Sequence, residues 1–205
     1  MNGLNINAMP KNTYNEDQGL QFGQWTDDVS RLMYRDVMPL AVSQIDFTGS
    51  VADYGGANGI VKDYIPQAVS IDIDESKQPD IVDDITTHQG NYDIVLARYV
   101  LHYLDDEQVR QMASTIQNRL VVIQFTNEAN DLAIKRQISD SNEAQKHFRT
   151  KDELYSLFTD FTVRKALQLE YTVTPEFYKN RLQIDTELSH QEQIQIIEME
   201  KQYEA

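Results

Sequence analysis

The chain has 205 residues, no cysteine and a formal net charge of −15. Its length suits one domain with a sizeable hydrophobic core, and the lack of cysteine excludes disulfides and thiolate chemistry. No apolar run approaches the roughly 18–20 residues that a membrane span requires, and the polar first residues show no basic-then-apolar signal pattern. The sequence therefore predicts one cytoplasmic domain, 1–205, without membrane contact.

The negative charge is unevenly distributed. Residues 1–134 contain 8 Lys and Arg against 20 Asp and Glu, and residues 182–205 contain 1 against 6, whereas residues 135–181 contain 9 against 7. An acidic body repels the phosphates of DNA and RNA, so general nucleic-acid affinity is disfavoured. A local contact with nucleic acid would have to use the basic residues Lys135, Arg136, Lys146, Arg149, Arg164 and Lys165. A solvated acidic surface with uneven patches is the simpler interpretation.

The N-terminal part, 1–45, is predicted to be a cap segment that ends in a helix. Thr26 caps this helix, and the two acidic residues that follow it suit the helix dipole. Apolar residues then recur at helical spacing from Val29 to Leu40. Pro39 falls inside that pattern and predicts a kink or an end nearby.

Strand and helix patterns alternate through the predicted core, 50–182, which is typical of a parallel sheet covered on both faces. Five strands are predicted at Val51–Tyr54, Ala68–Asp72, Asp80–Val82, Tyr92–Ala97 and Leu120–Phe125. Helices are predicted at Ile60–Ile65, after Asp105, around 128–139, and after Thr150, where Thr150 and Glu153 form a capping box. Two late strands, Phe161–Leu169 and Tyr171–Leu182, are predicted to form an antiparallel pair, followed by a peripheral C-terminal helix within 185–205.

A glycine-rich stretch follows the first strand, with the sequence Asp53-Tyr54-Gly55-Gly56-Ala57-Asn58-Gly59. Glycine allows a sharp turn and a close approach of the backbone to a ligand, and the start of the next helix offers unpaired N–H groups. The spacing does not match the dinucleotide fingerprint G-x-G-x-x-G. Because an ordinary tight turn would use the same residues, this stretch alone leaves both interpretations open.

Acidic residues stand at the ends of the next two strands. In open α/β sheets, ligands bind at the carboxyl ends of the strands, near the switch point beside the first strand. Asp72 ends the second strand, 19 residues after Asp53, where a carboxylate suits both hydroxyls of a ribose, with a turn cap as the alternative. After the third strand, Asp84 is preferred over Asp83 as the acceptor for an adenine amino group.

Residues 93–104 form an acid-initiated apolar strand followed by a short helix of the type Val-Leu-His-x-Leu. Together with the glycine stretch and the two strand-end acids, this run resembles the ordered motifs of the class I S-adenosylmethionine-dependent methyltransferases. The resemblance is close over about 50–125 and looser over 148–182. It implies a Rossmann-like three-layer α/β sandwich, with a seven-stranded, mostly parallel sheet and an antiparallel last hairpin, that binds S-adenosylmethionine.

The resemblance also implies which residues contact the cofactor. The glycines would lie against the methionyl part and the ribose, Asp53 would lie beneath the loop and face the amino group, and Ile73 and Ile85 would sandwich the adenine. Ala57 replaces the middle glycine of the family, a small departure provided that its φ stays negative. The full predicted set is Asp53, Gly55, Gly56, Ala57, Asn58, Gly59, Asp72, Ile73, Asp84, Ile85, Ala97 and Arg98.

The acceptor would face the ends of the fourth and fifth strands. The residues predicted there are Arg98, Tyr99, His102 and Thr126, with Thr126-Asn127-Glu128 forming the end of the fifth strand. His102 could serve as a base, although a packed or solvated histidine is commoner at such a position, so no catalytic residue is assigned. A base is needed only if the nucleophile must lose a proton. The histidines show no metal-ligand spacing, and no metal is predicted.

The predicted function is methyl transfer to a small molecule or another non-nucleic acceptor. The alternatives are a nucleic-acid methyltransferase that uses 135–181, a non-catalytic protein that binds S-adenosylmethionine or a partner, and, more distantly, a nicotinamide-dependent oxidoreductase. The sequence assigns neither the acceptor nor the oligomeric state.

Overall fold

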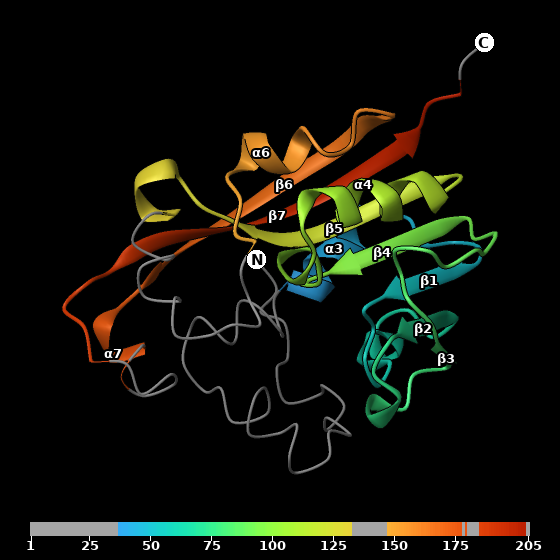
Figure 1. Ribbon diagram of the computed structural model, residues 1–205, viewed down its shortest axis with the longest axis horizontal. Coiled ribbons are helices and arrows are strands. Elements are labelled where there is room, and N and C mark those ends of the chain that lie inside the picture. Colours follow the sequence, from blue (N-terminus) through green and yellow to red (C-terminus); the bar gives the residue numbers. More distant parts are fainter. Residues whose placement is uncertain (1–36, 133–146, 178, 180–184, 204–205) are drawn as a thin grey trace.

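The computed structural model describes residues 37–132, 147–177, 179 and 185–203. Seven strands of this part form one sheet in the order β3-β2-β1-β4-β5-β7-β6 (Figure 1). The strands are β1 (Val51–Tyr54), β2 (Ala68–Asp72), β3 (Ile81–Val82), β4 (Ile94–Arg98), β5 (Arg119–Thr126), β6 (Phe161–Val173) and β7 (His190–Lys201). β1 to β5 pair in parallel, and β7 is antiparallel to both β5 and β6. The predicted fold class is therefore confirmed.

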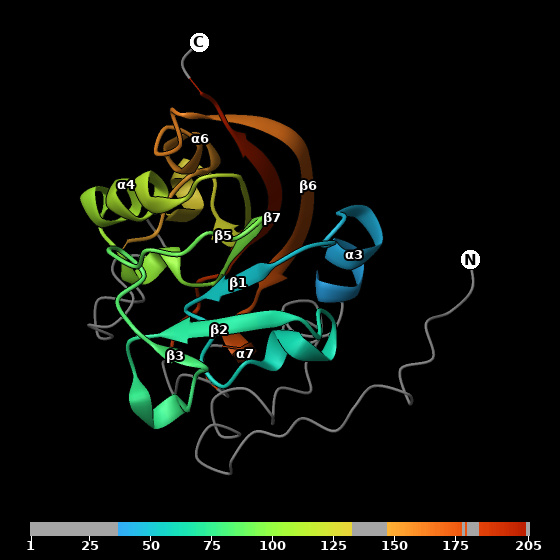
Figure 2. The same cartoon turned by 90° about the vertical axis from the view of Figure 1, so that its right-hand side faces the viewer.

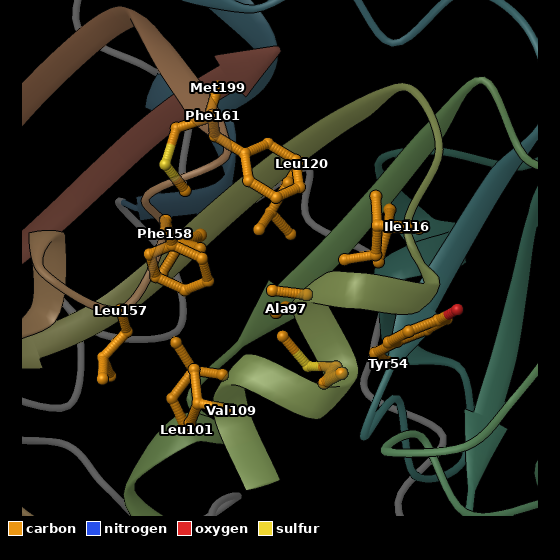
Figure 3. Close-up of a cluster of buried hydrophobic side chains, with 14 of the residues drawn as sticks. Tyr54, Ala97, Leu101, Val109, Ile116, Leu120, Leu157, Phe158, Phe161 and Met199 are labelled. Carbon is orange, nitrogen blue, oxygen red and sulfur yellow. The ribbon is translucent and has the colours of Figure 1, made fainter. Parts of the chain in front are cut away.

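Helices cover both faces of the sheet (Figure 2). α3 (Val37–Gln44) packs on one face, and α4 (Asp106–Thr115) and α6 (Lys151–Tyr155) pack on the other. Each face carries its own apolar cluster, and Figure 3 shows Val109 of α4, Leu120 of β5 and Phe158 together on the α4 face. Burial on both faces explains why β4 begins as a continuous apolar run.

Several predicted boundaries are confirmed. β1 and β2 have the predicted bounds. Asp105 caps α4, and Thr150 forms the predicted capping box with Glu153 at the start of α6. Pro39 lies within α3, which ends five residues further on. The predicted cap at Thr26 lies outside the described residues.

The intermediate helices are shorter than predicted. Ile60–Ile65 contains only the 3-10 turn η3 (Ile60–Asp63), because the left-handed Gly59 precedes it and Pro66 stops it soon after. The remaining 3-10 turns are η4 (Glu75–Lys77) and η5 (Leu101–Tyr103). Of the helix predicted around 128–139, residues 129–132 are helical and 133–139 lie outside the described residues.

The predicted ending of the chain is wrong in two respects. β6 is one continuous strand to Val173, after which the short helix α7 (Pro175–Phe177) follows, so no strand begins at Tyr171. The predicted C-terminal helix is instead β7, which lies inside the sheet between β5 and β6. Gln and Glu favour helices in isolation, but pairing along both edges of this segment overrides that local preference. The sheet therefore extends past the predicted core boundary at 182.

Among the described residues, none of the helices combines the length and apolar character needed to cross a membrane.

Candidate functional site

The glycine loop leaves β1 after Tyr54 and is held against the end of β2. The backbone N–H groups of Gly55 and Gly56 both donate to Ile71 O, at 2.8 and 3.2 Å. Gly55 has a φ of 69°, and a Cβ there would lie 2.4 Å from Cγ2 of Val100. Only glycine combines this backbone with so close a contact, so the loop is packed against the segment that follows β4.

Asp53 lies directly beneath this loop. A Cβ on Gly56 would approach its Oδ2 to 2.7 Å. The residue is 1 % exposed, and neither carboxylate oxygen has a hydrogen-bond partner. Burial raises the pKa of Asp53 to about 6, an effect that Arg98 opposes and Asp72 reinforces. Since buried charges are normally paired, this carboxylate is available for a cationic ligand group.

Arg98 contributes a second unpaired polar atom at the same edge. It ends β4, the strand that pairs with β1 next to Asp53, and its buried Nε has no hydrogen-bond partner. Ala97, the preceding residue, is fully buried in the apolar cluster on the α4 face. Only the backbone of Ala97 can therefore contribute to a site at this edge, whereas the Arg98 side chain carries a free donor.

Asp72 connects the loop to β2. Its Oδ2 accepts from the backbone N–H of Ala57 at 3.0 Å, and its Oδ1 accepts from the backbone N–H of Asp74 at 3.0 Å. Asp72 therefore caps the turn after β2, as the alternative interpretation of this residue predicts. Each carboxylate oxygen can accept a further bond, so the half-buried Asp72 keeps capacity for a hydroxyl.

The prediction for Ala57 requires a negative φ at this residue, and this requirement is not met. Its φ is 45°, in the left-handed region. That conformation directs its N–H to Asp72 and costs a non-glycine residue about 1–2 kcal/mol. Gly59, with a φ of 72°, begins η3, and the half-buried Asn58 lies between these two left-handed residues.

The residues predicted around an adenine differ in their exposure. The Ile73 side chain is 70 % exposed, whereas Ile85 is 6 % exposed and belongs to the core cluster on the α4 face. Asp84 orders the turn after β3, since its Oδ1 accepts from the backbone N–H and the hydroxyl of Thr86 at 2.8 and 2.7 Å. Ile73 is thus the one of the two isoleucines that is open to a ligand.

An unpredicted pair lies beside this turn. The buried His88 contacts Asp83, with 2.7 Å between its Nδ1 and Oδ2 of the carboxylate. The histidine lowers the pKa of Asp83 mainly through this hydrogen bond. The ring also packs edge-on against Tyr54 at 5.9 Å. The sequence carries no local signal for the pair beyond a spacing of five residues.

His102 is buried and oriented by Gln124. The Gln124 Oε1 accepts from the backbone N–H of Leu101 at 3.2 Å, so its Nε2 donates to Nδ1 of His102 at 3.1 Å. Nδ1 is therefore an acceptor and the ring proton lies on Nε2. Phe148 stacks parallel to this ring at 6.3 Å. This geometry matches the packed-histidine interpretation, because neither ring nitrogen is arranged to take a proton from an acceptor.

Tyr99 and Thr126, both predicted to face the acceptor, lie at the ends of β4 and β5. Tyr99 has a φ of 51° and stacks on Phe125 with 4.6 Å between ring centroids, and burial raises the pKa of its hydroxyl. Thr126 is 0 % exposed, and its hydroxyl has no hydrogen-bond partner. Asn127 follows, and its equally buried Oδ1 also lacks one, although its Nδ2 donates to Gln191 O at 3.2 Å.

The basic residues considered for nucleic-acid contact are already engaged where the structure describes them. Arg149 is buried and donates to the carbonyls of Leu101 and Leu104 and to the carboxylate of Asp106. It thus ties the segment after β4 to α4. Arg164 pairs with Glu200, and Lys165 donates to a carbonyl of α3. Lys135, Arg136 and Lys146 lie outside the described residues.

Comparisons with known proteins identify the fold. No family model matches the chain, and no curated protein sequence matches it significantly. Among solved structures, one from Bacillus halodurans, presented as a candidate methyltransferase, has a TM-score of 0.68 at 11% identity and covers 82% of this chain and 100% of that one. An S-adenosylmethionine-dependent methyltransferase from Methanosarcina mazei has a TM-score of 0.56 at 14% identity, covering 81% and 98%.

A third structure, magnesium protoporphyrin IX methyltransferase from Synechocystis with bound SAH, has a TM-score of 0.53 at 15% identity and covers 85% of this chain and 87% of that one. At these identities the likeness establishes the fold. The chain therefore has the fold of the class I S-adenosylmethionine-dependent methyltransferases.

Proposed function

We propose that this protein is an S-adenosylmethionine-dependent methyltransferase acting on a small molecule or another non-nucleic acceptor. The observation that carries the proposal is the buried, unpaired Asp53 carboxylate beneath a glycine loop at the carboxyl end of β1. A structural turn does not require a buried charge without a partner. A cofactor with an ammonium group supplies that partner.

The residues present fit this cofactor in charge. Asp53 suits the ammonium group of the methionyl part, and the free Nε of Arg98 suits its carboxylate. Gly55 and Gly56 let the loop backbone pack directly against Val100 and Asp53. Asp72 has remaining acceptor capacity for ribose hydroxyls, and the exposed Ile73 offers an apolar surface to an adenine ring.

The bound cofactor would supply an electrophilic methyl group on a sulfonium, open to in-line attack. The contribution of the protein is then mainly to hold the acceptor in line, and positioning of this kind can supply up to about 7–11 kcal/mol. His102 is packed in the core and oriented by Gln124, so it is not assigned as a base. An acceptor that is already a free nucleophile needs no base.

The nucleic-acid alternative has weaker support. A polynucleotide would need several free cations to neutralise its phosphates, whereas Arg149, Arg164 and Lys165 are engaged within the protein. A gel shift with RNA or DNA should show no complex near physiological salt. A complex that disappears when the charges of Arg164 and Lys165 are reversed would favour the alternative instead.

Calorimetry with S-adenosylmethionine and its demethylated product tests the proposal. The parent should bind both ligands and should not bind NAD, and Asp72→Ala should weaken binding by about 1.5–3 kcal/mol, the usual contribution of hydrogen bonds to a charged group. Asp93→Asn is the matched control, because this carboxylate accepts from Ser50 just before β4, at the opposite edge of the sheet. The control should leave binding unchanged. Binding of NAD without a response to either adenosyl ligand would refute the proposal.

A further inference from the structure

A row of polar side chains crosses the sheet where β5 ends. Thr126 of β5 pairs with Gln193 of β7, and Gln193 pairs with Glu170 of β6. Side chains of directly paired residues leave a sheet on the same face, so these three residues form one continuous row. The row lies on the face that also carries Gln124, since Gln124 and Thr126 are two residues apart in one strand.

Two carboxylates converge on the middle of this row. Nε2 of the buried Gln193 donates to Oε1 of Glu170 and to Oε1 of Glu128, at 3.3 Å in each case. The two carboxylate oxygens therefore cannot be further apart than twice that distance. Gln168 also donates to Glu170 at 2.6 Å. Within the described part of the chain, the hydrogen bonds to these two acids come from neutral amides, and neither acid forms a salt bridge.

The buried end of the row supplies independent support for a ligand. The hydroxyl of Thr126 is 0 % exposed and unpaired, and it lies beside Gln193, its cross-strand neighbour. Two carboxylates and a hydroxyl form a set with more acceptors than donors. An ammonium group has donors and no acceptor, so it complements this set.

The row lies at the acceptor side of the proposed methyltransferase site. Arg98 pairs with Ile123 of β5, and Thr126 is three residues further along that strand, about 10 Å at 3.3 Å per residue, with its side chain on the opposite face of the sheet. We propose that the carboxylates of Glu128 and Glu170, with the hydroxyl of Thr126, bind the protonated amine of a small cationic acceptor. The inference rests on the proposed function.

The test uses a matched pair of probes, n-hexylamine and 1-hexanol, which differ in charge and share the alkyl chain. Titrations of the whole protein are followed by NMR through the side-chain amide signals of Gln193, the group that lies between the two carboxylates. Hexylamine should shift these signals, and hexanol should leave them unchanged at the same concentration. Equal shifts with both probes would mean apolar binding and would overturn the proposal.

Variants then assign the binding to the row. Glu128→Gln and Glu170→Gln should each weaken hexylamine binding about three- to fivefold, the upper range for an exposed ion pair, and the double variant about tenfold or more. Thr126→Val, which keeps the volume, should also weaken it. Glu107→Gln removes an exposed carboxylate of α4 and should have no effect. Unchanged binding in the double variant overturns the proposal, and so does displacement of hexylamine by a lower concentration of Mg²⁺.

Calorimetry with S-adenosylmethionine on the same variants separates this inference from the proposed function. Cofactor binding should survive in all five variants. If the cofactor binds and hexylamine does not, the amine site is wrong and the methyltransferase proposal stands. If neither variants nor parent bind the cofactor but hexylamine still binds to the row, the cation site stands and its role as an acceptor site falls.

Discussion

Two regions at the carboxyl ends of the strands differ in how their side chains are hydrogen-bonded. Over β1 and β4, Asp53 keeps a carboxylate without a partner beneath a tightly packed glycine loop. Over β5, β7 and β6, amide side chains share their hydrogen bonds along rows, as Gln195 does with Gln168 at 2.6 Å. In the first region, a tightly packed loop over one unpaired charge should make stability and binding sensitive to single substitutions. In the second region, several hydrogen bonds are shared among side chains, so one substitution should have a smaller effect on stability.

The largest effect is expected from Gly55→Ala. The new Cβ would meet Cγ2 of Val100 at 2.4 Å on a backbone with a φ of 69°, so overpacking and left-handed strain together should lower the free energy of unfolding by about 2–5 kcal/mol. Gly59→Ala is the control, because its φ is similar at 72° but the closest contact is 3.3 Å. Denaturant titrations should show a smaller loss for the control. Equal losses would mean that the loop is not packed against Val100.

Asp53 should give stability an unusual pH dependence. Its folded pKa is about 6, against an ordinary value of 3.8, so between these values the folded state holds a proton that the unfolded state has released. Stability must then fall as pH rises through this window, by about 3 kcal/mol at 1.36 kcal/mol per pH unit. Unfolding of the parent and of Asp53→Asn between pH 3.5 and 7.5, roughly the range that brackets both values, should show the parent losing stability of this order relative to the variant as pH rises.

The ligand should reverse that trend. An ammonium group beside Asp53 favours the ionised carboxylate, so affinity for S-adenosylmethionine should rise as pH increases through about 6, the folded pKa. Asp53→Asn should remove this rise. Calorimetry at several pH values measures both effects, and an affinity that is flat across the window in the parent would place the ammonium group elsewhere.

Ala57→Gly should produce a smaller change of opposite sign. Glycine relieves the left-handed strain at a φ of 45°, offset in part by the greater freedom of glycine in the unfolded chain, for a net gain of about 0.5–1 kcal/mol in the free energy of unfolding. Ala52→Gly, at a fully buried position of β1 with ordinary backbone, should lose stability instead. Thermal unfolding of both variants decides whether the strain is real.

The smallest effect is expected among the amide side chains that are hydrogen-bonded to one another across β7 and β6. Gln195→Met keeps the length of the side chain and removes one hydrogen bond to the exposed Gln168, which water can replace. The free energy of unfolding should change by less than about 1 kcal/mol. A loss as large as that of Gly55→Ala would mean that the rows are as intolerant of change as the loop, and the contrast between the two regions would disappear.

The region of β1, β2 and the glycine loop was more predictable from the sequence than the region of β5, β6 and β7. The bounds of β1 and β2 and the position of the glycine loop depend on neighbouring residues, namely an apolar run, an acid and three glycines. The left-handed φ of Ala57 was not predictable, because it depends on the loop closing onto Asp72 from another strand. Local pattern is thus enough to locate the glycine loop and not enough to describe its strain.

The acceptor side was predictable only in part. Thr126 stands at the end of a recognisable apolar strand and was placed at the acceptor edge. Gln193 and Glu170 were assigned to a helix and to a break between two strands, because their partners are far away in sequence: Gln193 pairs with Thr126, and Glu170 pairs with Gln193. A helix-favouring composition cannot reveal a strand that is stabilised along both edges.

The insertion of β7 between β5 and β6 orders the events of folding. β6 precedes β7 in the chain but reaches the sheet only through it, so until residues 190–201 are paired, β5 has an open edge and β6 has no neighbour in the sheet. Open strand edges are templates for pairing with other chains, and pairings between distant segments form slowly. The proposed acceptor side is thus complete only once β7 is in place, and until then the open edge of β5 is a site for aggregation.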